Sequence, residues 1–307
     1  MALLSRFCFC LGWLLLAGWL PATRVQAQNT PPPPDLLGDL ERQTTDTLRR
    51  ELVAATFKGT RIINGHSVET PGGGTLVFLI SHRFGTLNSG AYNFFGLDQA
   101  TIRLGLEYGA TDRLTVGIGR SSLDKTYDGF LKYQALRQTT GLHAIPVSVT
   151  LFGSSALTSL RYFDGLDHTL PRRLTYTVQA LVARRFSPGL SVQLSPTVVH
   201  RNLVDTRRQH NDVYALGVAG RQKLNKRTAL MLEYYYRLPT TADPSTRNAL
   251  AAGFDIETGG HVFQLHVTNS QGMIERHFLT QTTGNFFDGD IYFGFNVARN
   301  FTLKPRL

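Results

Sequence analysis

The chain has little charge and, beyond its first residues, no long apolar run. Asp, Glu, Lys and Arg make up 18% of its 307 residues, against about 25% in an average soluble protein. Mean hydropathy is nevertheless only −0.11. After residue 27, no apolar run reaches the roughly 20 residues that a membrane-spanning helix needs. The composition therefore excludes a bundle of membrane helices and is typical of strands that are apolar on one face only.

Cysteine is confined to Cys8 and Cys10, close to the start of the chain. Both lie in an apolar run, residues 7–20, which follows a positive charge and precedes small and aliphatic residues ending at Ala27. This pattern predicts a secretory signal peptide over residues 1–27, with an uncleaved anchor helix as the alternative. Cleavage would leave a chain with no thiol, no disulfide and no cysteine-based metal site.

Acidic residues are fewer than basic ones, and the formal net charge is +10. Removal of Arg6 and Arg24 with the signal peptide lowers it to +8. The remaining basic residues are scattered, with no basic helix or dense run, and export would separate the chain from cytoplasmic nucleic acid. A nucleic-acid partner is therefore not expected.

Residues 28–74 read as a tether and a periplasmic segment that precede the main domain. Four consecutive prolines, Pro31 to Pro34, indicate an extended linker. Leucines at helical spacing predict an amphipathic helix over 35–58, lying under the main domain rather than plugging it.

Beyond residue 75 the apolar residues alternate with polar ones, which is typical of strands with one apolar face. Most of these segments have 9–13 residues, a length that suits tilted strands crossing a bilayer. Twelve strands are predicted, over residues 75–84, 98–108, 112–120, 127–136, 144–153, 173–186, 189–202, 211–223, 227–237, 248–258, 260–269 and 289–301.

Short and long links take turns along the chain. Links of a few residues, such as 109–111 and 187–188, alternate with long ones, such as 85–97, 153–172 and 270–288. Outer-membrane barrels have short periplasmic turns and long external loops. The sequence thus predicts an all-β fold, a transmembrane antiparallel up-and-down β-barrel over residues 75–307 in the bacterial outer membrane. A soluble barrel or sandwich is the alternative.

In such a barrel the apolar faces meet lipid and the polar faces meet the lumen. The polar faces carry either a charge network that rigidifies a narrow lumen or a lining that selects solutes. The candidate lumen-lining residues are Arg103, Glu107, Lys132, Gln134, Gln179, Gln193, Gln264 and His266.

Several stretches resemble an uncharacterised family of bacterial outer-membrane barrels, the domain-of-unknown-function family 5777. The segments that carry the resemblance are 56–69, 103–109, 114–120, 259–266 and 289–295. The resemblance covers most of the chain after the signal peptide and implies a barrel. It implies no activity and no catalytic residue.

The segment 56–69 is the most unusual part of the chain before the first strand. It combines charged and polar side chains with an Asn-Gly turn signal. Two interpretations are open: a periplasmic turn that packs against or enters the barrel mouth, and a ligand-binding or gating element. The residues of this candidate periplasmic motif are Lys58, Arg61, Asn64, His66 and Glu69.

No catalytic residue, cofactor or metal site is predicted. The enzyme alternative is a lipid-acting, phospholipase-like barrel, which needs a serine activated by a histidine. His266 is followed by Asn269 and Ser270, so the spacing of two residues expected for that histidine and serine is missing. The expected partners are outer-membrane lipid and the barrel-insertion machinery. The predicted role is a narrow passive pore or an envelope scaffold, with a closed barrel that binds through its external loops as a further possibility.

Overall fold

A computed structural model describes residues 36–40, 50–162, 168–204, 206, 209–258 and 261–303. The chain divides into two compact units, Met1–Thr45 and Asp46–Leu307. In the first unit residues 36–40 are helical. The predicted signal peptide and the four prolines lie outside the described residues, so these two predictions stay predictions.

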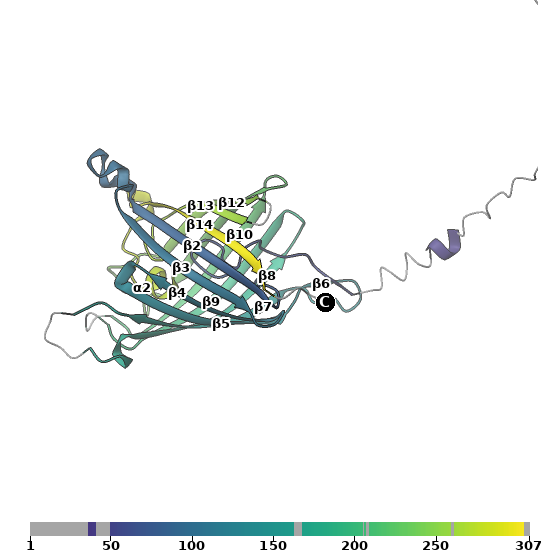
Figure 1. Cartoon of the computed structure of the whole chain (residues 1–307), viewed down its shortest axis with the longest axis horizontal. Helices are drawn as coiled ribbons and strands as arrows, with labels where there is room; N and C mark the ends of the chain where they lie inside the picture. The colour runs from purple at the N-terminus through teal and green to yellow at the C-terminus, as the bar shows by residue number, and fades with distance from the viewer. Residues whose placement is uncertain are drawn as a thin grey trace, which may run out of the picture. The chain divides into compact units, whose positions relative to one another are not determined.

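The second unit is a closed barrel of twelve antiparallel strands (Figure 1). Each strand pairs with its neighbours in chain order, and the last strand closes the barrel by pairing with the first. The predicted twelve-stranded barrel is confirmed, and most predicted strand ends lie within three residues of the observed ones. The barrel strands are β2 (Thr75–Thr86), β3 (Ala100–Gly109), β4 (Leu114–Ser121), β5 (Thr126–Leu136), β7 (Ser148–Thr158), β8 (Leu174–Arg185), β9 (Leu190–Arg201), β10 (Asp212–Lys223), β11 (Thr228–Arg237), β12 (Ala249–Thr258), β13 (His261–Thr268) and β14 (Tyr292–Thr302).

The two ends of the barrel differ. Short links and the start of β2 lie at one end, called here the turn end. The other end, the loop end, carries the long links and most of the short helices. These helices are η1 (Leu87–Ser89), η2 (Ala91–Gly96), η3 (Leu123–Lys125), η4 (Pro171–Arg173), α2 (Glu275–Thr280) and η5 (Phe286–Asp288). No helix among the described residues is long and apolar enough to cross a membrane.

The predicted helix over 35–58 is wrong for residues 50–58, which the structure describes. Here β1 (Glu51–Leu52) pairs with β6 (Thr139–Thr140) in a separate two-stranded sheet. The amide of Val53 donates to the carbonyl of Gln138 at 3.0 Å. The backbone of residues 51–53 therefore finds partners in the β5–β7 connection, and the amides of Thr56 and Phe57 donate to Glu69, so these groups are not paired within a helical turn.

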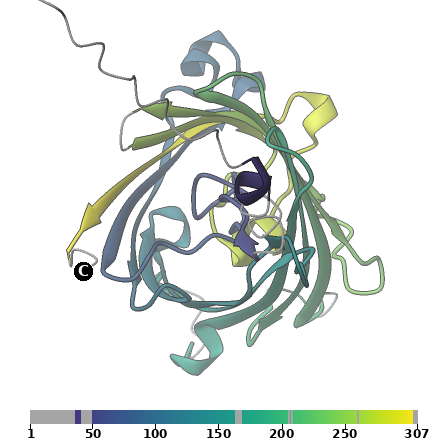
Figure 2. The ribbon, with the colours of Figure 1, turned by 90° about the vertical axis from the view of Figure 1, so that its right-hand side faces the viewer.

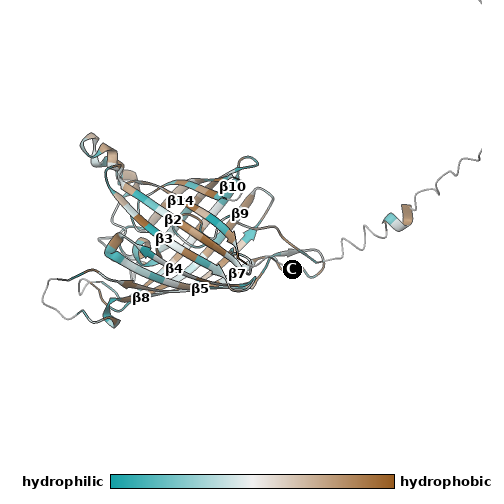
Figure 3. Ribbon diagram, viewed as in Figure 1, coloured by the Kyte–Doolittle hydropathy of each residue, from teal (hydrophilic) through white to brown (hydrophobic). Residues whose placement is uncertain are grey.

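Buried and exposed residues alternate along the barrel strands, as Figure 3 shows by hydropathy. The outward residues are mostly apolar, and most of the inward ones are polar or small. Apolar clusters also lie inside, and the largest joins Phe57, Ile62, Ile63 and Val68 with side chains from β8, β10, β11 and β12. Residues 57–68 do not belong to the wall, so something other than strands fills the lumen.

Candidate functional site

The lumen holds residues 56–69, which enter from the turn end and are called here the plug (Figure 2). The plug folds as a tight hairpin in which Arg61 pairs with His66 and the amide of Ile62 donates to the carbonyl of Gly65 at 2.9 Å. A Cβ atom on Gly65 would lie 2.0 Å from Oη of the buried Tyr235, so only glycine fits the tip. The segment does more than meet the barrel mouth: it fills the middle of the lumen.

The tip of the plug is held by one carboxylate of the wall. Glu233 on β11 accepts hydrogen bonds from the backbone amides of Ile63, Asn64 and Gly65 at 3.0–3.2 Å. Its side chain is buried, and hydrogen bonds to a charged group in a water-poor site are stronger than neutral ones. Glu233 therefore anchors the hairpin tip.

Amide side chains of three further strands bind the rest of the plug backbone. Gln193 on β9 accepts from the Val68 amide at 2.8 Å and donates to the His66 carbonyl at 2.8 Å. Gln264 on β13 donates to the carbonyl of Ile62 at 2.7 Å, and Asn296 on β14 to that of Ile63 at 3.0 Å. Every hydrogen bond between plug and barrel strands among the described residues involves at least one side chain, so the strand ladder does not depend on the plug.

The opposite side of the plug meets a cation and a hydroxyl. The ammonium of Lys132 on β5 donates to the carbonyl of Glu69 at 2.5 Å. The hydroxyl of Thr150 on β7 donates to the carbonyl of Val68 at 2.6 Å. Contacts with strands on both sides therefore fix the plug across the full width of the lumen.

A second segment enters from the loop end. Residues 270–283, called here the inner loop, include α2 and bury Met273, Ile274, Phe278 and Leu279. The sequence predicted an external loop over 270–288, and this is wrong for the inner loop because its four large apolar side chains need cover from water. They pack inside the barrel, Phe278 against Tyr235 with ring centroids 4.9 Å apart.

The plug and the inner loop touch each other in the lumen. Nη1 of Arg61 donates to the carbonyl of Met273 at 3.0 Å, and its Nη2 lies 3.1 Å from Nε2 of His66. Burial and the nearby Arg61 lower the pKa of His66 well below its usual range, so the ring is neutral and accepts from Arg61. The carboxylate of Glu275 lies 4.0 Å from the same ring nitrogen, Nε2 of His66. The two segments together close the lumen.

The inner loop is attached to the wall through His277. Its Nε2 lies 3.6 Å from the carboxylate of Asp124 in η3 and 3.3 Å from the hydroxyl of Thr126. Burial lowers the pKa of His277, and its interaction with Asp124 lowers the pKa of that carboxyl. The contact with Asp124 opposes the effect of burial on the His277 ring.

All eight residues proposed for the lumen lining lie on the inward face and are buried. Lys132, Gln134, Gln193 and Gln264 bind the plug. Gln179 donates to the hydroxyl of Thr197 at 2.9 Å, and both ring nitrogens of His266 lack a partner among the described residues. Arg103 also forms a bidentate pair with Asp128 on β5, at 2.9 and 2.5 Å. The guanidinium lies over Gly119, where a Cβ atom would come within 2.2 Å of it. Both carboxylate oxygens of Glu107 lack a hydrogen-bond partner among the described residues.

All five residues of the candidate periplasmic motif belong to the plug, and Arg61, Asn64 and His66 are buried in its hairpin. Lys58 stays at the turn end and forms an ion pair with Glu257 at 3.1 Å. Glu69 accepts from the backbone amides of Thr56 and Phe57 and so closes the base of the plug. Inward residues that sequence reasoning missed include Arg83, Asp128, Glu233 and Tyr235. The alternation of apolar and polar residues on β5 and β11 could have indicated that Asp128, Glu233 and Tyr235 face inward.

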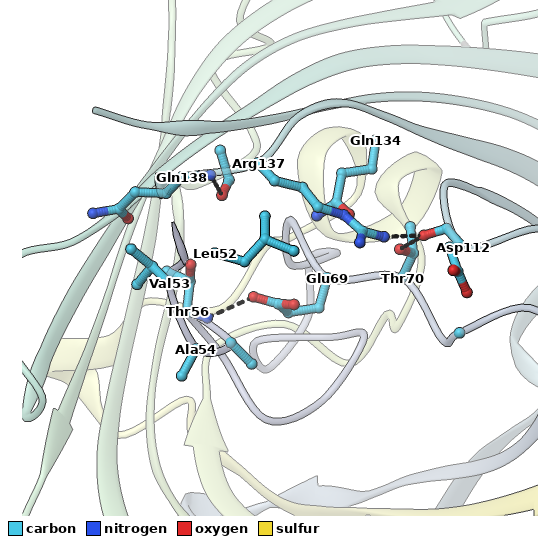
Figure 4. Close-up of a pocket in the computed structure, with 13 residues that line it drawn as sticks. Leu52, Val53, Ala54, Thr56, Glu69, Thr70, Asp112, Gln134, Arg137 and Gln138 are labelled. Atoms are coloured by element: carbon cyan, nitrogen blue, oxygen red, sulfur yellow. Dashed lines mark hydrogen bonds between the residues drawn. The ribbon is translucent and has the colours of Figure 1, made fainter. Parts of the chain in front are cut away.

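A hollow of about 210 Å³ remains at the turn end, beside the point where the plug enters (Figure 4). Its lining includes Glu69, Thr70, Asp112, Gln134 and Arg137, and the hydroxyl of Thr70 donates to the carbonyl of Asp112 at 3.3 Å. The guanidinium of Arg137 donates to the carbonyl of Asp112, which leaves it directed along the wall rather than into the hollow. The hollow is a cleft between the plug base and the rim.

The residues that a lipid-acting enzyme would use are not brought together. His266 is buried on the inward face, and both ring nitrogens lack a partner among the described residues. The hydroxyl of Ser270 donates to the carbonyl of Gly272 at 3.3 Å. Within the part of the chain that the structure describes, no group of three His, Cys, Asp or Glu side chains could hold a metal ion.

The sequence model of the domain-of-unknown-function family 5777, described as a membrane-bound β-barrel domain, matches residues 57–301. No curated protein matches the chain. Among solved structures, the NanC porin is similar over 75% of this chain and 100% of its own, at 8% identity and a TM-score of 0.45. CdiB from Escherichia coli is similar over 76% of this chain and 64% of its own, at 9% identity and a TM-score of 0.35. The Ralstonia pickettii toluene transporter TbuX is similar over 67% of this chain and 48% of its own, at 12% identity and a TM-score of 0.25.

Proposed function

The chain belongs to the family of membrane-bound β-barrel domains numbered 5777, and on this premise we propose that it is an outer-membrane pore held closed by its own plug. The predicted signal peptide and the apolar outward faces of the strands support an outer-membrane location. The proposed role is passage of solute rather than catalysis.

One observation carries the proposal: the plug occupies the lumen without taking part in the strand ladder. Its bonds to Glu233, Gln193 and Lys132 use side chains of the wall. The wall strands pair with one another all around the barrel. Withdrawal of the plug would therefore leave a closed barrel intact, with a polar inner face that water can hydrate.

The polar character of the contact also favours a removable plug over a permanent filling. A hydrogen bond between protein groups exchanges for hydrogen bonds to water, so its net contribution is small, about 0.5–1.5 kcal/mol for neutral groups. The apolar part of the contact is restricted to a few side chains, such as Phe57 and Ile62. Conduction requires that the inner loop move as well, because it closes the lumen from the loop end.

The test is the conductance of protein extracted from membranes and inserted in a planar bilayer. Gly65→Ala prevents the hairpin tip from seating below Tyr235. Gly272→Ala disturbs the inner loop, since its Cβ atom would lie 2.1 Å from that of His277. Neither change alters the wall. We expect few openings in the wild type, more in each variant, and stable ohmic steps in the double variant.

Gly59→Ala is the matched control, because its Cβ atom would meet only the backbone of Arg61, at 3.2 Å. Hydrogen exchange of the plug and inner-loop amides shows whether each segment has been released. Release of both segments without ohmic steps would overturn the pore and leave a closed envelope scaffold.

A further inference from the structure

The outer wall contains a groove that the pore proposal does not use. It has a volume of about 540 Å³ and lies over β3, β4 and β5. We propose that this groove binds a membrane lipid with an anionic, phosphate-bearing headgroup. Its size falls within the range of about 300–1,000 Å³ that is common for ligand sites. Its lining is almost entirely apolar and includes Phe78, Leu104, Leu106 and Ile118.

One outward position beside the groove carries no side chain. Gly129 on β5 pairs with Ile118 on β4 and faces outward between larger neighbours. A Cβ atom there would meet only the carbonyl of Gly117, at 3.9 Å, so the space above Gly129 is open. Backbone of Gly105 and Gly119 forms part of the floor. The groove itself lies between the outward side chains of Leu104, Leu106, Ile118 and Tyr127.

A cation stands at one end of the groove. Arg120 is exposed on the outward face of β4, one residue before that strand ends at the loop end. Its guanidinium lies 5.4 Å from the ring centre of Tyr127, which also lines the groove. No carboxylate pairs with Arg120 among the described residues. Asp128, which lies nearby, forms its ion pair with Arg103 instead, at 2.5 Å.

This arrangement fits an amphiphile in one orientation. Strand β4 runs from the turn end to the loop end, so Ile118 lies deeper in the wall than Arg120. An acyl chain can lie along Leu106 and Ile118, while an anionic headgroup meets Arg120 at the membrane surface. An exposed cation at the membrane interface attracts anionic lipid. An arginine fork also binds two phosphate oxygens at once.

Two other outward arginines also lie over aromatic rings, but neither lines a groove such as this one. Arg184 lies 5.1 Å from the ring of Phe186, and Arg299 lies 4.9 Å from that of Phe301, both at the turn end. Neither arginine lines the groove over β3–β5. They are the pattern expected of residues that anchor a barrel at the membrane surface.

The test is native mass spectrometry of the full protein, extracted from membranes in detergent and titrated with lipid. Phosphatidylglycerol and phosphatidylcholine with identical acyl chains are the probes. We expect the wild type to retain one phosphatidylglycerol about fivefold more strongly than phosphatidylcholine, the factor expected of one cation at a membrane surface. Arg120→Gln abolishes this preference, while Arg184→Gln, the matched control at the other end, leaves it unchanged.

Gly129→Leu adds an outward side chain next to Ile118, which lines the groove, without removing the charge, and we expect it to displace the bound phosphatidylglycerol. Heat-modified mobility on gels confirms that each variant is folded. Equal retention of the two lipids by the wild type overturns the proposal. So does an equal loss in Arg120→Gln and Arg184→Gln, which would indicate general attraction to basic residues. None of these measurements depends on conduction, so either proposal can fail without the other.

Discussion

Replacement of Glu233 by glutamine tests whether one carboxylate holds the plug in place. Its two oxygens accept from the amides of Ile63, Asn64 and Gly65 at 3.0–3.2 Å. Glutamine keeps one acceptor oxygen and places a donor NH₂ group where the other stood, so at least one amide faces a donor. A hydrogen bond to a charged group contributes about 1.5–3 kcal/mol, and a buried donor left unpaired costs a comparable amount.

We therefore expect Glu233→Gln to weaken plug docking by about 2–4 kcal/mol. Since about 1.4 kcal/mol corresponds to a factor of ten, the undocked fraction rises roughly 30- to 800-fold. The measurement is hydrogen exchange of the Asn64 and Gly65 amides, whose protection reports local opening. Amides in the middle of β9 should keep their protection, because the strand ladder does not include the plug.

Glu257→Gln is the control with the same chemical change on a neighbouring strand. Glu257 pairs with Lys58 of the plug at 3.1 Å, but the two side chains are 27% and 47% exposed. Partly exposed pairs of this kind contribute at most about 1 kcal/mol, so plug protection should change little. Equal protection of the plug in Glu233→Gln and in the wild type would refute the anchoring role given to Glu233.

Three further predictions concern the wall and the inner loop. Arg103→Ala or Asp128→Ala should destabilise the barrel by about 3–5 kcal/mol, because each leaves a buried charge without its partner; the double variant should lose less than the sum, as measured by urea unfolding followed on gels. Gly253→Ala brings a Cβ atom to 2.4 Å from a carbonyl of the next strand and should cost about 1–3 kcal/mol. Gly153→Ala, whose Cβ atom would meet nothing within 4 Å, should leave the unfolding midpoint unchanged. Burial lowers the pKa of His277 below its ordinary 6.5, so the undocked loop binds a proton more readily and docking weakens as pH falls through about 6.5. Exchange of the inner-loop amides should show this acid loosening in the wild type but not in His277→Gln; identical pH profiles would contradict it.

Strand number, strand position and the facing of the wall residues followed from the alternation of apolar and polar residues. A strand has a period of two, so each residue's face follows from that of its neighbours. Arg103, Lys132 and Gln193 were assigned to the inward face in this way, and Glu233 could have been, because it alternates with Leu232 and Tyr234. These relations are local in the chain, so they can be read without knowing which strands meet.

The sequence did not predict in the same way which segments fill the lumen. The tip of the plug meets Glu233 across about 170 residues of chain, and no local pattern connects the two. The apolar residues Phe278 and Leu279 were a signal that the inner loop is buried, but periodicity does not say against what. The predicted helix over 35–58 was wrong for residues 50–58 for a related reason. The β5–β7 connection pairs with the backbone of residues 51–53, and Glu69 accepts from the amides of Thr56 and Phe57.

The sequence by itself determined a membrane barrel, its twelve strands and the two chemically different faces of its wall, because these depend on residues adjacent in the chain. Only the tertiary structure decided that the lumen is closed by the plug and the inner loop, and that the outer wall has a groove over β3, β4 and β5 beside Arg120. Both features depend on side chains from distant strands meeting at one place. Closure of the barrel brings these side chains together, and no single segment of the chain includes all of them.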